Sequence, residues 1–154
     1  SHVPLFIKLP NQIKENTNVN GYVSNVDLFA TIMDYLQLGT HKSDGQSLRD
    51  LIEKKPTNHG DYVVTEWDYR GPIQPNYMIV KDGWKLMIPY TEDSKVINAM
   101  YNLNDDPHER KNLLGNNTNK NLYIDIAEEL KSDLLEWLKK HNSKHYAGVQ
   151  KRKI

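Results

Sequence analysis

The sequence predicts an α+β fold in which a four-stranded antiparallel sheet is covered on one face by a long C-terminal helix. Residues 61 to 103 contain short runs whose apolar side chains recur at every second position, a pattern typical of half-buried strands. Two of these runs are joined by Asp82-Gly83, a strong short signal for a β-hairpin. Residues 120 to 141 carry apolar side chains at helical spacing. Because the sheet needs one covered face, this helix is its expected cover.

The expected strands are joined by short links, which favours consecutive pairing into an antiparallel meander. Their predicted ranges are Tyr62–Trp67, Asn76–Lys81, Trp84–Pro89 and Val96–Leu103. The apolar stripe of the final helix consists of Tyr123, Ile126, Ala127, Leu130, Leu134, Trp137 and Leu138. Residues 142–154 are basic and show no periodicity, so we expect a solvated basic tail; a nucleic-acid-binding arm is the less supported interpretation.

The first part of the chain predicts a different kind of structure. The run Val3–Ile7 is almost wholly apolar, which is typical of a strand covered on both faces, as in parallel sheets under helices. Apolar residues at helical spacing follow from Val26, with Ser24 as the expected N-cap and Asp27 as its capping-box partner. Gly39 is the expected C-terminal stop of this helix.

The segment Met100–Leu114 is expected to clamp the end of the last strand onto the core. Asp106 is a natural cap for a helical turn, with Glu109 three residues later as in a capping box. Leu113 and Leu114 should then return to the surface on which the strand packs. This segment predicts structure and no catalytic chemistry.

Composition excludes several classes of protein. The chain has 154 residues, enough for a domain with a real core. Its 20 basic and 20 acidic side chains cancel, so no global field favours nucleic acid or a membrane as partner. There is no cysteine, which excludes disulfides, zinc–thiolate sites and thiol catalysis. No apolar run approaches membrane-spanning length.

Several blocks of the sequence resemble the C-terminal portion of formylglycine-dependent sulfatases of the alkaline phosphatase superfamily, in the same order and at similar spacing. The most characteristic block spans Met100–Leu114 and contains Tyr-Asn-Leu, Asp-Pro, Glu and Asn-Leu. The other blocks are Val3-Pro4-Leu5-Phe6-Ile7, Val23 to Ile32, Leu38-Gly39 and Asp44-Gly45-Gln46-Ser47-Leu48. The resemblance extends to about residue 140.

The resemblance implies an organisation in three parts. Residues 1–57, with their strand and helix, would complete the larger α/β sulfatase domain whose other strands precede them. Residues 58–141 would form the C-terminal α+β subdomain, and residues 142–154 the basic tail. The implied partner is therefore the upstream catalytic domain of the same protein. Without that domain, we expect the apolar strand Val3–Ile7 to be exposed and to promote self-association.

The resemblance also implies an activity for the parent protein, namely hydrolysis of sulfate esters on sulfated glycans. Sulfatases use a formylglycine made within a Cys/Ser-x-Pro-x-Arg signature, and calcium held by Asp-Asp and Asp-Asn/His pairs. The Cys/Ser-x-Pro-x-Arg signature and the Asp-Asn/His pair do not occur in this chain, and its Asp-Asp pair, Asp105-Asp106, is explained by capping and turn formation, so we assign no catalytic residue and no metal ligand here. Formylglycine and calcium are thus expected in the parent alone, which would be exported to the periplasm or outside the cell.

Four residues between the first two strands are the candidates for substrate binding: Glu66, Trp67, Tyr69 and Arg70. In the family this region lies near the mouth of the substrate pocket. Aromatic faces stack on sugar rings, and the planar fork of arginine suits sulfate or carboxylate. A structural interpretation stays open beside this one, with Trp67 in the core and Arg70 paired with Asp68.

Other functional classes remain. A phosphonate monoester hydrolase or phosphodiesterase of the same superfamily can have a similar C-terminal part. A free-standing carbohydrate-binding module would also present aromatic residues on a small sheet. A metal site at His141 and His145 is not expected, because no third ligand accompanies their helical spacing.

Overall fold

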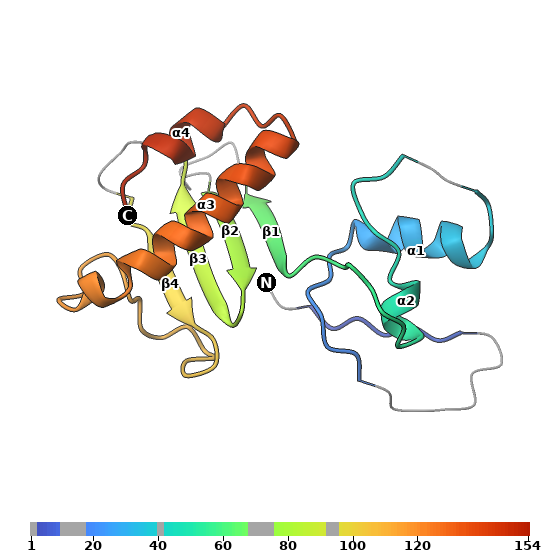
Figure 1. The fold of residues 1–154 in the computed structure, drawn as a ribbon. Coiled ribbons are helices and arrows are strands. Elements are labelled where there is room, and N and C mark those ends of the chain that lie inside the picture. The colour runs from blue at the N-terminus through green and yellow to red at the C-terminus, as the bar shows by residue number, and fades with distance from the viewer. Residues whose placement is uncertain (1–2, 10–17, 40–41, 68–75, 92–95) are drawn as a thin grey trace. The chain divides into compact units, whose positions relative to one another are not determined.

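The computed structural model describes residues 3–9, 18–39, 42–67, 76–91 and 96–154 (Figure 1). The chain divides into two compact units. The N-terminal unit contains Ser1–Gly21 and Val26–Asn58, and the sheet unit contains Tyr22–Asn25 and His59–Ile154. Each unit is described by itself.

The sheet unit is built on the predicted four-stranded antiparallel meander, with strand order β1-β2-β3-β4. The strands are β1 (Tyr62–Trp67), β2 (Asn76–Lys81), β3 (Trp84–Pro89) and β4 (Ala99–Asn102). The ranges of the first three are as predicted. The last strand is shorter than the predicted range Val96–Leu103, and before Ala99 the main-chain carbonyls of Val96 and Asn98 accept from the side chains of Arg152 and Asn112 instead of from a strand.

The hairpin at Asp82-Gly83 is confirmed, and its backbone explains the residue choice. Both residues have positive φ, 49° at Asp82 and 77° at Gly83, as a type I′ turn requires. A Cβ at Gly83 would lie 2.4 Å from Nδ2 of Asn104, so the site also lacks room for a side chain. The turn pairs Lys81 with Trp84 and sets the register of the central strands.

The predicted helical cover is also confirmed. A short 3₁₀ turn (Lys120–Leu122) leads into α3 (Ile124–Lys140), which runs across the sheet (Figure 1). The core lies between α3 and the sheet, and each large side chain buried there contributes about 1.5–3 kcal/mol. Its members are Tyr77, Ile79, Leu86, Ile88, Met100, Leu113, Leu114, Ala127, Leu130, Leu134, Leu138 and Val149.

The C-terminal segment differs from the prediction. Residues Tyr146–Lys151 form a further helix, α4, and Val149 is fully buried in the core. The guanidinium of Arg152 donates from Nε to Asn98 Oδ1 at 3.0 Å, from Nη1 to the Thr91 carbonyl at 3.1 Å, and from Nη2 to the Val96 carbonyl. The expectation of a solvated tail is therefore wrong for residues 146–152. One turn of helix is too short to show a period, and the partners of Arg152 lie far away in sequence.

The clamp at Met100–Leu114 is confirmed, although by different hydrogen bonds from those predicted. Oδ1 of Asn112 accepts from the amides of Met100 and Leu114, both at 3.0 Å, and the Leu113 amide donates to the Met100 carbonyl at 2.9 Å. Leu113 and Leu114 are buried, as expected.

The predicted capping box in this segment is wrong. Residues 103–119 form turns and bends, with no helix. Oδ2 of Asp106 accepts from the amide of Lys111 at 2.8 Å. Oε2 of Glu109, whose φ is 54°, instead accepts from the buried Lys85 ammonium at 2.6 Å. An ion pair with a buried lysine outweighs a local cap, because that lysine would otherwise be buried without a counter-charge.

The N-terminal unit contains α1 (Asp27–Tyr35) and α2 (Arg49–Ile52). The N-cap of α1 is Val26, without a side-chain capping hydrogen bond, so the prediction of Ser24 as the cap is wrong. Oδ1 of Asp27 instead accepts from the amide of Gln46 at 2.9 Å. The buried Thr31 accepts likewise from the amide of Leu48 at 2.9 Å, so two polar residues of α1 hold the loop before α2.

The end of α1 is a Schellman motif centred on Gln37, two residues before the predicted stop at Gly39. Gln37 has φ 54° and donates to the Asp34 carbonyl at 3.1 Å. The Leu38 amide donates to the Met33 carbonyl at 3.1 Å, as this motif requires. Gly39 also has positive φ, 85°, and so continues the reversal.

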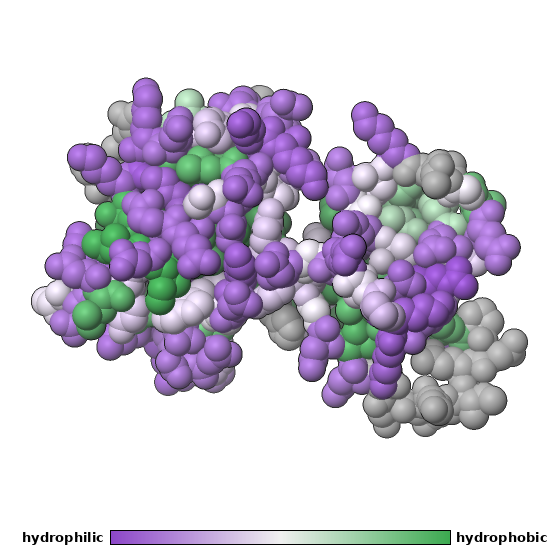
Figure 2. Space-filling view, viewed as in Figure 1, coloured by the Kyte–Doolittle hydropathy of each residue, from purple (hydrophilic) through white to green (hydrophobic). Residues whose placement is uncertain are grey.

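The predicted strand Val3–Ile7 forms no strand among residues 3–9 as the structure describes them. A strand needs a neighbour to satisfy its amides and carbonyls, and the sheet among the described residues contains only β1, β2, β3 and β4. Phe6 is 92% exposed. Further exposed apolar residues of the N-terminal unit are Val3, Val26, Phe29, Ile32, Leu36 and Leu38. Apolar surface is visible among the hydrophilic side chains in Figure 2. Among the described residues, no helix is long and apolar enough to cross a membrane.

Candidate functional site

The candidate residues Glu66 and Trp67 occupy the last two positions of β1, an edge strand of the sheet. Trp67 is 52% exposed, which argues against its placement in the core. Successive side chains of a strand point to opposite faces, so the two do not lie together on one face. Glu66 pairs across the strands with Tyr77, whose ring is in the core under α3, so Trp67 lies on the face away from that helix. Tyr69, Arg70 and Asp68 lie outside the described residues.

The carboxylate of Glu66 is held by a buried phenol. The hydroxyl of Tyr77 donates to Oε1 of Glu66 at 2.7 Å and lies 3.1 Å from Oγ of Ser143. A phenol hydroxyl can donate one hydrogen bond, and the Tyr77 hydroxyl donates its bond to the Glu66 carboxylate. In the hydrogen bond between Tyr77 and Ser143, the hydroxyl of Ser143 is therefore the donor. Tyr77 has no exposed surface, and this burial, with the nearby carboxylate, raises its pKa, while the bond to Ser143 opposes that rise. The phenol therefore stays a neutral donor.

Aromatic rings pack beside the hydrogen bonds that join Glu66, Tyr77 and Ser143. The ring of His145 stacks on Tyr90, with centroids 3.7 Å apart and an interplanar angle of 21°. Its Nε2 lies 3.9 Å from Oε1 of Glu66. A Cβ at Gly148 would lie 2.2 Å from the Tyr90 carbonyl oxygen, so only glycine lets α4 approach this closely. The end of β1, the α3–α4 link and α4 therefore meet at one corner of the sheet unit (Figure 1).

In the described part of the chain, His141 and His145 do not form a metal site together. His141 packs on Trp137 with centroids 4.4 Å apart, and His145 packs on Tyr90, so the two histidines have different neighbours. No group of three His, Cys, Asp or Glu side chains that could hold a metal occurs among the described residues. The described part of this corner can offer the exposed indole face of Trp67, which suits a sugar ring.

Sequence reasoning identified the end of β1 but missed the residues that support it. The sequence did not indicate Tyr77 or Ser143, and it brought up His145 only as a metal ligand beside His141, a site that was not expected. One signal was available: Tyr77 begins the apolar run of its strand, and a buried tyrosine hydroxyl needs a hydrogen-bond partner. The identity of that partner could not be read from the sequence.

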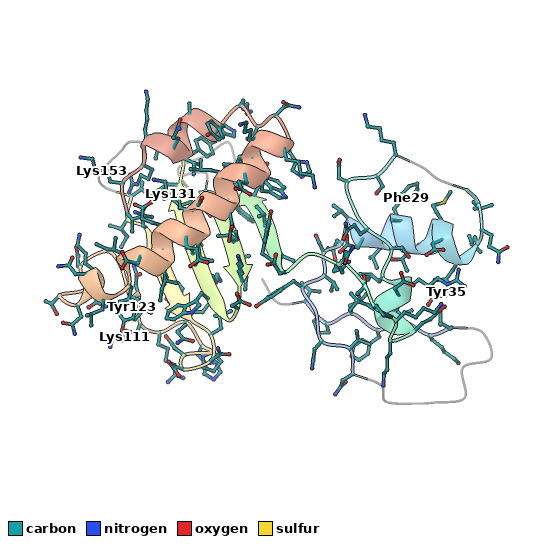
Figure 3. The ribbon with its side chains drawn as sticks, in the orientation of Figure 1. Phe29, Tyr35, Lys111, Tyr123, Lys131 and Lys153 are labelled. Atoms are coloured by element: carbon teal, nitrogen blue, oxygen red, sulfur yellow. The ribbon has the colours of Figure 1, made fainter. Side chains whose placement is uncertain are left out.

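The N-terminal unit contains a second polar cluster, which joins α1 to α2. Nη1 of Arg49 lies 3.2 Å from Oδ1 of Asp34, and its Nε lies 2.8 Å from Oε1 of Glu53. The hydroxyl of Ser47 donates to Asp34 at 2.7 Å and is the main cause that lowers the pKa of this carboxyl; Arg49 adds to the effect. Each partner is accounted for inside the unit, so this cluster is structural. The side chains of both units are drawn in Figure 3, which labels Phe29 and Tyr35 on α1.

Known proteins resemble this chain in sequence. Arylsulfatase K of Bos taurus is 30% identical over 121 residues, covering 73% of this chain and 22% of the relative. A sulfatase of Formosa agariphila is 26% identical over 161 residues, covering 92% of this chain and 28% of the relative. The multifunctional alkaline phosphatase superfamily protein PehA of Trinickia caryophylli is 27% identical over 152 residues, covering 90% and 29%.

Solved structures share the fold. One, a protein in complex with its substrate D-glucosamine-2-N,6-O-disulfate, is 25% identical with a TM-score of 0.65, covering 83% of this chain and 26% of its own. A second, from Bacteroides thetaiotaomicron, has a TM-score of 0.66 at 22% identity, covers 79% of this chain and 25% of its own, and supports the fold alone.

The meander, its helical cover and the clamp are thus those of the C-terminal portion of a sulfatase in the alkaline phosphatase superfamily. The family model for "N-sulphoglucosamine sulphohydrolase, C-terminal" matches residues 1–150, and the chain belongs to this family. It spans less than a third of the length of the relatives it matches.

Proposed function

We propose that this chain is the C-terminal part of an enzyme that hydrolyses sulfate esters of amino sugars, and that it supports the fold and the rim of the substrate pocket. The observation that carries the proposal is the match of residues 1–150 to the sulphohydrolase family. The structural neighbour bound to a sulfated glucosamine supports a sulfated amino sugar as the substrate class.

Within this proposal, the end of β1 forms part of the rim. Trp67 offers about half of its surface for contact with a sugar ring. Tyr69 and Arg70, which follow in sequence, are proposed to contribute a second aromatic face and a cation for the sulfate group. Glu66 lies at the same end of β1, but its carboxylate is held on the side of α3, so it supports the rim without contacting the sugar.

The catalytic groups of a sulfatase would have to come from the upstream part of the protein. The sequence contains no cysteine and no Ser-x-Pro-x-Arg motif, and the described residues contain no cluster of potential metal ligands. The residues present therefore do not fit a formylglycine or a calcium ion, and no catalytic step is assigned to this chain.

The proposed partner is the upstream catalytic domain of the same protein. The exposed apolar side chains of the N-terminal unit support this, because Phe6 alone leaves 92% of its surface uncovered, and a docked domain would remove such surface from water. Self-association through residues 3–7 is the expected behaviour when that domain is missing. By the same family relation, we propose that the complete protein is exported to the periplasm or outside the cell.

A second candidate function is hydrolysis of phosphodiesters or phosphonate monoesters. This second candidate is supported by the similarity to PehA, a multifunctional member of the superfamily, over 90% of this chain. The C-terminal portion does not contain the groups that would separate the two reactions.

The test uses the complete protein that contains this chain. Purified enzyme is assayed on glucosamine carrying N- and O-sulfate groups, on a phosphodiester and on a phosphonate monoester. We expect release of sulfate to exceed the other reactions. Faster release of phosphate or phosphonate products would establish the second candidate instead.

The rim is tested by Trp67→Ala, with Leu122→Ala as the matched control. Leu122 is also exposed, at 73%, but lies in the 3₁₀ turn before α3. In Trp67→Ala, the indole no longer buries apolar surface against the sugar, and such burial contributes roughly 25 cal/mol per Å² to binding. We therefore expect KM to rise about tenfold. The control should leave KM unchanged. Equal KM values for both variants would show that Trp67 does not contact substrate.

A further inference from the structure

We propose that Glu66 is a positioning residue, and that Tyr77 and Ser143 brace its carboxylate so that the end of β1 presents Trp67 in a fixed orientation. The part of this inference in which Trp67 contacts a substrate rests on the proposed function. The brace itself does not.

The hydrogen bonds of Glu66 point away from the surface that Trp67 occupies. Its Oε1 accepts from the buried Tyr77 hydroxyl at 2.7 Å, and that hydroxyl also meets Ser143 at 3.1 Å. Nε2 of His145 lies 3.9 Å from the same Oε1 of Glu66. All of these groups belong to the side of the sheet that carries α3. A substrate on the opposite face would therefore meet Trp67 and not this oxygen.

The position of Glu66 explains why a brace is needed. β1 is an edge strand, so among the described strands its last residues pair with β2 alone, through Glu66–Tyr77 and Trp67–Asn76. Ends of edge strands fray at little free-energy cost, because few backbone hydrogen bonds hold them. A bond from a neutral phenol to a carboxylate is stronger than one between neutral groups. This bond joins the strand end to Tyr77 on β2, and the bond between Tyr77 and Ser143, 66 residues further along the chain, connects both to the link between α3 and α4.

The C-terminal segment completes the brace. Ser143 lies in the link between α3 and α4, and Arg152 and the buried Val149 fix the segment that follows. The close approach of Gly148 to the Tyr90 carbonyl sets α4 against the end of β3. The rim residue Trp67 is thus positioned by the last part of the chain.

The first experiment measures hydrogen exchange in the complete protein, by mass spectrometry of peptides covering β1 and β3. Tyr77→Phe keeps the ring in the core and removes only the hydroxyl. We expect this variant and Glu66→Ala to speed exchange in the second half of β1 about tenfold, as loss of a hydrogen bond to a charged group implies. Glu66→Gln, whose amide oxygen still accepts from the phenol, should stay within about twofold of the wild type.

The controls separate the brace from a general loss of stability. The peptide covering β3 provides the internal reference, because a globally destabilised variant would exchange faster there too. Tyr62→Phe removes a phenol hydroxyl at the other end of β1 and should leave the Glu66–Trp67 end unchanged. Should Tyr77→Phe unfold the protein, Ser143→Ala tests the same brace from the surface. Unchanged exchange in Glu66→Ala and in the hydroxyl variants overturns the brace, whatever the protein hydrolyses.

The second experiment measures kcat and KM with a sulfated glucosamine. A positioning role predicts that Glu66→Ala raises KM about three- to tenfold with a smaller change in kcat, that Glu66→Gln restores the wild-type KM, and that Tyr77→Phe has no further effect in the Glu66→Ala background. If Glu66→Gln raises KM as much as Glu66→Ala, the carboxylate contacts substrate directly and the positioning role is wrong. Absence of any sulfate release by the wild type would refute the proposed function, while the exchange experiment still decides the brace.

Discussion

Replacing Arg152 by alanine should markedly destabilise the sheet unit, although Arg152 is the third residue from the C-terminal end of the sequence. The guanidinium donates to Asn98 Oδ1 at 3.0 Å, to the Thr91 carbonyl at 3.1 Å and to the Val96 carbonyl, and its own carbonyl accepts from the buried Lys131 ammonium at 2.7 Å. The variant removes the three side-chain bonds and leaves the main-chain bond in place. These bonds hold the connection between β3 and β4 to the C-terminal segment.

The magnitude follows from the number and kind of the bonds lost. A hydrogen bond from a charged donor contributes about 1.5–3 kcal/mol, but bonds made by one side chain are not additive, and Arg152 is only partly buried. We therefore expect a loss of about 3 kcal/mol in the free energy of unfolding. In a unit of this size, that corresponds to a fall in Tm of roughly 12 °C or more.

Equilibrium unfolding in urea, followed by tryptophan fluorescence, measures this loss. Trp84 and Trp137 pack against the core of the sheet unit and report on it. Lys153→Ala is the matched control, because its side chain is exposed and only its main-chain carbonyl bonds to Asn98 (Figure 3). If the two variants differ by less than about 0.5 kcal/mol, the C-terminal segment does not hold the sheet, and a solvated tail describes it better.

Three further predictions concern the clamp, the response to pH and the isolated chain. Asn112→Ala should lower the free energy of unfolding by about 2 kcal/mol, because it leaves the Met100 and Leu114 amides without their acceptor, whereas exposed Asn116→Ala should change it little; urea titration compares them. Backbone donation from Arg110, then Lys111, lowers the pKa of Asp106, so its stabilisation is present above the unfolded-state pKa and is lost as pH falls through the folded-state value. Asp106→Asn should therefore flatten the acid side of the stability–pH curve, and parallel curves for variant and wild type would contradict this. The 154-residue chain alone should neither hydrolyse a chromogenic aryl sulfate above a heat-killed control nor bind calcium stoichiometrically in calorimetry, since it contains no nucleophile signature and no metal-ligand cluster in its described part.

The parts of the fold that depend on local chemistry were predictable. The alternation in β1, β2 and β3 is a property of neighbouring residues, and Asp82-Gly83 prefers the positive φ values that the hairpin needs. The apolar stripe of α3 likewise repeats within one segment, so its extent and buried face followed from spacing. Of the candidate site, Glu66 and Trp67 could be placed at the end of β1, and the structure adds that Trp67 is exposed and not in the core.

What only the tertiary structure decided is the choice of partner for each polar side chain. Glu109 follows a capping pattern, yet it pairs with Lys85, 24 residues away. Tyr77 and Ser143 meet across 66 residues, and Arg152 reaches Asn98 across 54. Local propensities are set by a residue and its neighbours, whereas burial of a charge or a phenol is set by the packing of whole elements, which then demands a partner wherever the fold provides one. For this reason the sequence by itself determined β1, β2 and β3, the turn between β2 and β3 and the main helix, whereas packing determined the extent of β4, the brace at Glu66 and the role of the C-terminal segment.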